Sequence, residues 1–353
     1  MRVALNTAIA TAADVDLVVE AERLGARAVW VPEAWGGDAL TPLAYLAART
    51  TTMSLGSACV QLGARTPANL AMSALSLQAL SGGRFLLGIG TSGPAVMEGW
   101  HGVRFDSPLR ATRETIEIVR MAASGERVEY EGEVYRLPLP GGPGRALRTM
   151  APPAPVPVYV AAIGPKNLEL TGELADGWLG NAFLPEHAPA FLDHLADGAA
   201  RAGRTVADLD LVIPVAVEFT DDPDEAVRRH AQGYAFTIGA MGTAGRNFYN
   251  AAFARQGFGD DVAAVAELWQ EGRREEAADR VPLELGRATN LLGTPDMIRD
   301  RLRLYRQAGI TTLSAKVEGT ARERLDTLTR LIDLVAGVDD EKDRDTRASS
   351  TEG

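Results

Sequence analysis

The chain has 353 residues, of which 46% are hydrophobic and 24% are charged, with a formal net charge of −11 and a pI of about 5.0. This length and composition allow a large core, in one α/β barrel or in two smaller domains. The acidic balance argues against nucleic acid or an anionic membrane as a partner, and the single cysteine excludes an intramolecular disulfide.

The amino terminus, MRVALNTAIA, is too short and too polar for a signal peptide. No run approaches the ~18 apolar residues of a membrane span. A protein without disulfides or a leader fits a reducing compartment, so we expect it in the cytoplasm.

Apolar runs rich in β-branched residues alternate with amphipathic helical patterns along the chain. They predict eight strands, near residues 3–6, 27–31, 53–62, 84–90, 156–163, 176–181, 209–219 and 311–317. Eight strands alternating with helices indicate a parallel sheet that closes into a (β/α)8 TIM barrel, with a doubly wound open sheet as the alternative.

Two insertions interrupt the regular alternation. Residues 127–139 alternate around Glu131-Gly132, which predicts a hairpin after the fourth strand, and helical sequence fills 223–308 before the eighth. We therefore expect a single barrel domain over residues 1–337. The charged residues 338–353 lack apolar periodicity and are expected to form a disordered tail.

The loop after the fourth strand contains Gly88, Gly90 and Gly93 in the spelling G-x-G-x-x-G, which is typical of a dinucleotide-binding turn. Such a turn needs a helix directly after it and an acidic residue ~20 positions later, at the end of a second strand. Here Gly99 and Gly102 interrupt the next segment, the sequence that follows is helical, and three strands come before. We interpret the segment as a loop on the catalytic face of a barrel, with a plain tight turn as the alternative.

Several segments together resemble the bacterial-luciferase-like family, and within it the branch that uses the deazaflavin coenzyme F420. The matching segments are WVPEAWG, LGSACVQLGARTP, LSGGRFLLGIGTSGPAVMEGWHG, PVYVAAIGPKNLELTGELADGW and LLGTPDMIRDRLRLYRQAGI. The resemblance covers roughly Val3 to Val335 and implies a TIM barrel with a late insertion, F420 as the cofactor and a homodimer. An FMN-dependent monooxygenase and a non-catalytic flavin-binding barrel remain as alternatives.

The resemblance implies a cofactor site at the carboxyl ends of the strands. It places a non-prolyl cis peptide at Ala58-Cys59, behind the ring, and an anion at a helix that begins at Pro165, near Lys166. The implied cofactor-binding residues are Ala58, Cys59, Gly90, Thr91, Ser92, Ala162, Ile163, Gly164, Pro165, Lys166 and Trp178. A solvated surface position is the alternative for Lys166, and a core position is the alternative for Trp178.

A deazaflavin carries hydride, so the protein must also supply or remove a proton. The candidate acids are Glu33, after the second strand, and His101, after the fourth. A salt bridge is the alternative for Glu33, and a loop hydrogen bond is the alternative for His101. On the substrate side we expect Trp35, Glu98 and Trp100.

Two positions depart from the family's sugar-phosphate dehydrogenases, because Ala34 and Gly93 stand where those enzymes carry histidine and glutamate. We therefore expect a reductase of an activated C=C or C=N bond in a small molecule or a modified peptide. The segment TSG is also neutral where the family's FMN-using members tend to carry a cation, and this difference weighs against FMN. The four histidines make no close ligand pair with Cys59, so no metal site is predicted.

Overall fold

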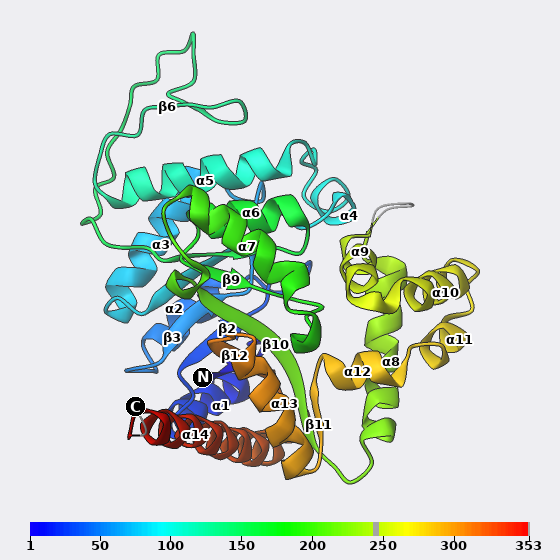
Figure 1. Cartoon of the computed structure of the whole chain (residues 1–353). Helices are drawn as coiled ribbons and strands as arrows, with labels where there is room; N and C mark the ends of the chain where they lie inside the picture. The colour runs from blue at the N-terminus through cyan, green and yellow to red at the C-terminus, as the bar shows by residue number, and fades with distance from the viewer. Residues whose placement is uncertain (243–246, 352–353) are drawn as a thin grey trace.

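The computed structural model describes residues 1–242 and 247–351, with the backbone alone for 341–351. Its centre is a closed ring of eight parallel strands (Figure 1). In chain order these strands are β1 (Arg2–Asn6), β2 (Ala28–Val31), β3 (Ser54–Ser57), β5 (Phe85–Gly90), β8 (Val158–Ala161), β9 (Gly177–Leu179), β10 (Asp210–Phe219) and β12 (Thr312–Lys316). Because β12 pairs with both β1 and β10, the sheet has no open edge, and the predicted TIM barrel is confirmed.

Helices between successive strands cover the outside of the ring (Figure 1). They are α1 (Ala12–Arg23), α2 (Leu40–Ala47), α3 (Pro67–Ser81), α5 (Pro108–Ala123), α6 (Pro165–Leu174), α7 (Pro189–Arg201), α13 (Pro295–Gln307) and α14 (Ala321–Thr351). The ends of α3 follow from its sequence: the Thr66 hydroxyl accepts from the Asn69 N–H, and Gly82 adopts the left-handed conformation that stops the helix.

The expected hairpin is present as the antiparallel pair β6 (Tyr130–Glu131) and β7 (Arg136–Leu137), and it projects from the barrel beside α5 (Figure 1). The buried Glu114 carboxylate of α5 holds it, because it accepts hydrogen bonds from the N–H groups of Glu133, Val134 and Tyr135. The short segments α4 (Pro94–Met97) and β4 (Val60–Gln61) lie on the β3–β5 side of the barrel mouth.

The expected helical insertion lies between β10 and β12 and packs at one side of the barrel (Figure 1). It comprises α8 (Pro223–Ala240), α9 (Phe248–Phe253), a π-helical turn (Ala254–Phe258), α10 (Gly259–Gln270), α11 (Arg274–Asp279) and α12 (Leu283–Ala288). A strand that the sequence did not predict, β11 (Leu291–Gly293), pairs with the end of β10. Short 3₁₀ turns also occur at Pro185–His187 and Val206–Asp208.

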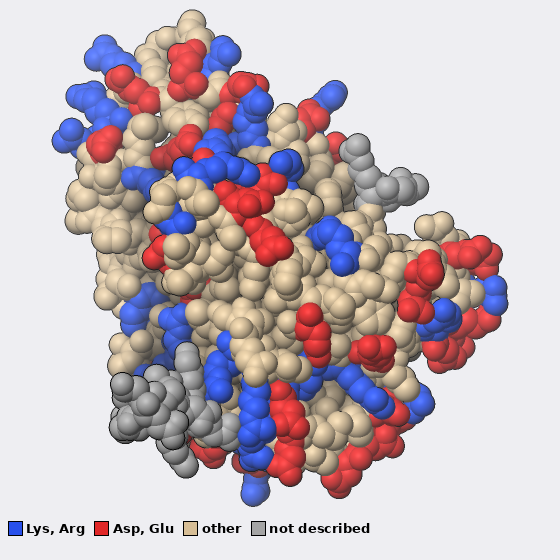
Figure 2. Space-filling view, in the orientation of Figure 1, with Lys and Arg blue, Asp and Glu red and all other residues tan. Residues whose placement is uncertain are grey.

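The carboxyl terminus differs from the sequence prediction. Residues 338–353 were expected to be disordered, but α14 continues as a helix to Thr351, and only residues 352–353 fall outside the described chain. Because adding residues to an existing helix is easier than starting a new one, a charged segment without an apolar stripe can extend a helix that begins on the barrel. Over the face in Figure 2, basic and acidic side chains are interspersed. No helix of the described residues is long and apolar enough to cross a membrane.

The amino-terminal half of the barrel interior is filled. The rings of Trp30 and Tyr159 meet there edge to face, with centroids 5.1 Å apart. Gly56 and Gly177 make room for them, because a Cβ at either position would lie 2.2 Å from a ring atom. The Tyr159 hydroxyl donates to Asp210, which also pairs with Arg2. Space for a ligand therefore remains at the opposite end, where the strands finish.

Candidate active site

The third strand is interrupted by a cis peptide between Ala58 and Cys59, as the resemblance implied. This bulge presses against the fourth strand of the barrel, β5. A Cβ on Gly88 would lie 1.8 Å from the Ser57 carbonyl oxygen, and one on Gly90 would lie 2.4 Å from the Cys59 Sγ. These two glycines are therefore required by the close approach of a neighbouring strand and not by a pyrophosphate.

The last glycine of the motif has a different environment. Gly93 has open space around its Cα and precedes α4, a helix of only four residues. Ahead of it, Ser92 adopts a positive φ of 57°, and the Thr91 hydroxyl donates to the Ser92 carbonyl. Thr91 also lines a cavity of about 220 Å³ with Arg65, together with other residues of this side of the barrel. The predicted cofactor residues Thr91 and Ser92 thus lie in a tight turn at the end of β5.

Small side chains occupy the inward positions at the mouth of the barrel. Ala58, Cys59 and Ala161 pack against the interior cluster that contains Trp30. A Cβ on Gly90 would come within 3.3 Å of the Ala161 Cβ, which places the two residues on the same face. Such a floor of alanine and glycine leaves room for a flat ring to lie across the strand ends.

The Cys59 side chain is half-buried at the mouth of the barrel. Burial, with a further contribution from the negative charge of Glu33, raises the pKa of the Cys59 thiol to about 12. The residue is a neutral thiol near pH 7, so its contribution to the site is shape and not nucleophilic attack.

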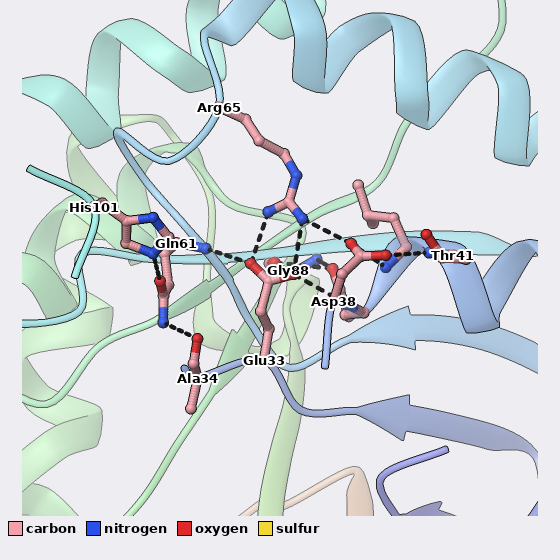
Figure 3. Close-up of polar contacts among 11 residues, drawn as sticks. Glu33, Ala34, Asp38, Thr41, Gln61, Arg65, Gly88 and His101 are labelled. Carbon is pink, nitrogen blue, oxygen red and sulfur yellow. Dashed lines mark hydrogen bonds and ion pairs between the residues drawn. The ribbon is translucent and has the colours of Figure 1, made fainter. Parts of the chain in front are cut away.

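Glu33 forms an ion pair that joins two loops (Figure 3). Its carboxylate oxygens lie 2.7 and 2.9 Å from the two terminal nitrogens of Arg65 and accept from the Ala39 N–H at 3.0 Å. Arg65 also pairs with Asp38 at 2.7 Å. With the Glu33 side chain only 7% exposed, the geometry favours the salt-bridge alternative, because both carboxylate oxygens are engaged by the Arg65 guanidinium.

His101 reaches the site through a buried amide (Figure 3). Its Nε2 lies 2.5 Å from the Oε1 of Gln61, and the Nε2 of the same amide donates to the Ala34 carbonyl at 3.0 Å. The carbonyl fixes which way the Gln61 amide faces, so the His101 Nε2 must be the donor. The predicted loop hydrogen bond is present. Because it engages only Nε2, the Nδ1 nitrogen of His101 can still exchange a proton.

The residues expected on the substrate side lie in the loops around the mouth. Trp35 and Trp100 are 50% and 66% exposed, so their rings are available to a ligand. The Glu98 carboxylate accepts from the Phe105 N–H at 3.1 Å and thereby closes its own loop.

The loop after β8 meets the helix that was expected to bind an anion. Gly164 is the N-cap of α6, Pro165 follows at its first position, and Ala162 and Ile163 lead into it. Lys166 is 75% exposed, and its Nζ pairs with Glu169 at 2.9 Å. The charge of Lys166 is therefore already partly neutralised within α6, which favours its surface alternative.

The prediction that Trp178 walls the cofactor pocket is corrected by the structure. Trp178 is fully buried and packs with Phe183 and Phe191 in the core between sheet and helices. Its indole Nε1 donates to the Ala162 carbonyl at 2.8 Å, so it supports the cofactor loop from behind. Because side chains alternate along β9, Leu179 and not Trp178 faces the barrel interior.

The insertion contributes residues that the sequence did not point to. Phe248 of α9 lies 3.9 Å from the position of a Cβ on Gly164, and the Arg255 guanidinium donates to the Ile163 carbonyl at 2.7 Å. Burial raises the pKa of the Tyr249 hydroxyl, and a smaller contribution comes from Cys59. The insertion therefore covers the mouth on the side of β8.

The fold is an α/β barrel whose mouth carries a non-prolyl cis peptide at the end of its third strand. The model of the luciferase-like monooxygenase family matches residues 2–312, and the chain belongs to that family. A Mycobacterium tuberculosis protein named as a coenzyme F420-dependent oxidoreductase is 40% identical over 84% of this chain and 88% of its own length.

Two further relatives carry names of the same class. A 5,10-methylenetetrahydromethanopterin reductase of Archaeoglobus fulgidus is 28% identical over 84% of this chain and 86% of its own. The solved structure of the F420-dependent tetrahydromethanopterin reductase of Methanopyrus kandleri superposes with a TM-score of 0.75 at 21% identity. That superposition covers 94% of this chain and 97% of the other, and it shows the shared fold.

Proposed function

We propose that this protein is an F420-dependent oxidoreductase, and that it works as a reductase of an activated C=C or C=N bond. The observation that carries the proposal is the 40% identity, over most of both chains, with a protein named as an F420-dependent oxidoreductase. The mouth of the barrel fits such a cofactor, because Ala58, Gly90 and Ala161 leave a flat floor beside the cis-peptide bulge.

Different residues of this chain bind the cofactor and supply the proton. Bound in its reduced form, F420 supplies a hydride. The bulge at Ala58-Cys59 would support the ring, and the N–H groups at the start of α6 would bind its anionic tail. His101 holds a proton at the mouth and delivers it through Nδ1, while Gln61 fixes the orientation of the imidazole.

Fluorescence titration of the purified protein with F420 and with FMN tests the cofactor. We expect saturable binding of F420 and weak binding of FMN. Tight binding of FMN alone would support the monooxygenase alternative, and binding of neither would support a non-catalytic barrel.

Turnover tests the reaction. Oxidation of reduced F420 should accelerate when 2-cyclohexen-1-one or a cyclic imine is added. Replacement His101→Phe should lower kcat and leave the affinity for F420 nearly unchanged, because the imidazole acts on the proton and not on the cofactor. If His101→Phe and wild type have equal kcat, water supplies the proton.

We also propose that the protein is a homodimer. The neighbouring helices α2 and α3 expose Tyr45, Met72 and Leu80, each more than half accessible. An apolar surface of this kind is typical of a face that a second copy covers. Light scattering after size exclusion should give twice the chain mass for wild type and the chain mass for Met72→Glu/Leu80→Glu, whereas a monomeric wild type would exclude the dimer.

A further inference from the structure

One charged side chain at the mouth has no role in the site described so far. Lys316 is the last residue of β12, where the eighth strand ends, and it lies in register with Ala216 of β10. Residues Leu313, Ala315 and Val317 pack outward against the helices. By alternation along the strand, Ser314 and Lys316 therefore face the barrel interior.

The residue below Lys316 confirms this direction. Ser314 is buried and accepts a hydrogen bond from the Asn6 side-chain amide, across β1, at 3.2 Å. Asn6 ends β1 on the same side of the mouth. Lys316 thus lies two residues beyond Ser314 on the same face of β12, at the end of the strand.

Lys316 has no partner among the described residues. Three other cations near the mouth are engaged: Arg65 pairs with Glu33, Lys166 pairs with Glu169, and Arg255 is bound to the Ile163 carbonyl. No ion pair or hydrogen bond within residues 1–242 and 247–340 involves the Lys316 ammonium.

The Lys316 side chain is exposed to solvent at the end of β12, and desolvation by the protein around it lowers its pKa. A cation that is surrounded by protein, accessible and unpaired is available to a ligand with negative charge.

We propose that Lys316 is a substrate-binding residue that holds the carbonyl or carboxylate oxygen of the acceptor. The inference rests on the proposed reductase function and narrows it to α,β-unsaturated carbonyl compounds or acids. A cationic iminium acceptor would be repelled by the ammonium group, so the C=N class is disfavoured.

The proposed reduction requires one hydride, from reduced F420, and one proton, from His101 or water. The hydride of reduced F420 adds to the β-carbon, and the electron pair of the C=C bond moves to give an enolate with its negative charge on oxygen. Lys316 stabilises this oxygen, which carries more charge in the transition state than in the ground state. A proton from His101 or water then adds to the α-carbon, so one hydride and one proton have been added in total.

The first test uses binding alone. 4-Nitrophenol is a stable mimic of an enolate, and its phenolate form has a distinct visible absorbance. With the F420-loaded protein we expect binding as phenolate. Lys316→Met should weaken that binding at least tenfold, and Lys316→Arg should retain most of it. Lys342→Met, which removes a charge from the far part of α14, is the matched control and should equal wild type.

The second test separates substrate binding from cofactor binding. With 2-cyclohexen-1-one and reduced F420, Lys316→Met should lower kcat/KM at least tenfold, while fluorescence titration gives an F420 affinity within twofold of wild type. A loss of F420 affinity in Lys316→Met would instead make the residue a cofactor ligand and overturn the proposal. Unchanged phenolate binding in Lys316→Met would overturn it too.

The experiments distinguish a failure of the reductase function from a failure of the role of Lys316. If wild type reduces no acceptor but binds phenolate through Lys316, the reductase function is wrong and the oxyanion site stands. If Lys316→Met reduces the enone as well as wild type does, the function stands and the role of Lys316 is wrong.

Discussion

Single residues around the cis-peptide bulge differ sharply in how much change they tolerate. An alanine at position 88 would collide with the Ser57 carbonyl, and one at position 90 would collide with the Cys59 sulfur, whereas position 93 is open. Overpacking of this kind costs about 1–3 kcal/mol. We expect Gly88→Ala and Gly90→Ala to lower the urea midpoint and Gly93→Ala to leave it unchanged.

A second substitution distinguishes the two collisions. Replacement Cys59→Ala removes the sulfur that Gly90→Ala would meet, so the double variant should recover stability. The same replacement cannot relieve Gly88→Ala, whose collision is with backbone. Additive losses in Gly90→Ala/Cys59→Ala would contradict the geometry.

The thiol of Cys59 should be unreactive in the folded protein. With its pKa raised to about 12, it holds on the order of a thousandfold less thiolate at pH 8 than a free cysteine of pKa ~8.5. Alkylation by iodoacetamide, followed by intact mass, should be at least a hundredfold slower in native than in urea-unfolded protein. Equal rates would mean that the pKa of the Cys59 thiol is not raised in the folded protein.

For single residues, the sequence indicated which side chains lie at the mouth better than it indicated which side chains they contact. It predicted Glu33 and His101 as polar residues of the mouth, but their contacts with Arg65 and Gln61 span 32 and 40 residues of chain. No local pattern encodes such separations. The sequence also did not predict that Lys316 faces the barrel interior, because this direction follows only from the observed alternation of side chains along β12.

Among the elements, the connection from α2 to β3 depends on one carboxylate of α1. Glu22 accepts from the N–H groups of Thr51, Thr52 and Met53, at distances down to 2.6 Å. Burial opposes ionisation of Glu22, but the three hydrogen bonds outweigh it and lower its pKa.

Replacement Glu22→Gln should therefore lower the free energy of unfolding by about 1–2 kcal/mol at neutral pH, measured by urea unfolding. A lowered native pKa stabilises the fold above the unfolded value of ~4.3. The difference between wild type and Glu22→Gln should thus shrink as pH falls through the native pKa of Glu22. Glu20→Gln, on the same helix in an exposed pair with Arg23, should change stability little at any pH. A pH-independent difference for Glu22→Gln would contradict this account.

Elements with strong periodicity were predictable and the shortest ones were not. The eight barrel strands, the hairpin and the helical insertion all follow from patterns in the sequence. Strand β11 and helix α4 have three and four residues, too few to carry a period. Strand β4 lies within the predicted third strand, but the pattern does not show the break that separates it from β3. Strand β11 depends on its pairing with the end of β10, which is a tertiary contact.

For the molecule as a whole, the insertion is attached to the barrel at a few buried points. The Gln256 amide is 1% exposed, donates to the Ala182 carbonyl at 2.7 Å and accepts from the Leu184 N–H at 2.8 Å. Both partners belong to the loop after β9. Gln256 therefore ties the π-helical turn of the insertion to the mouth.

Replacement Gln256→Leu should loosen the insertion without unfolding the barrel. It leaves two buried backbone groups without partners, at a cost of about 2–3 kcal/mol. Hydrogen exchange should accelerate in α9 and α10 and stay unchanged in β1 and β2. Gln270→Leu, at the exposed end of α10, is the control. Uniform acceleration across the chain would show that barrel and insertion open together.

The aromatic rings of Trp30 and Tyr159 close the lower half of the barrel. Below the mouth the barrel is therefore solid, and a cofactor and its substrate would have to enter and leave on the same side of the molecule. Two side chains that contact neither ligand would thereby make cofactor and substrate share one route.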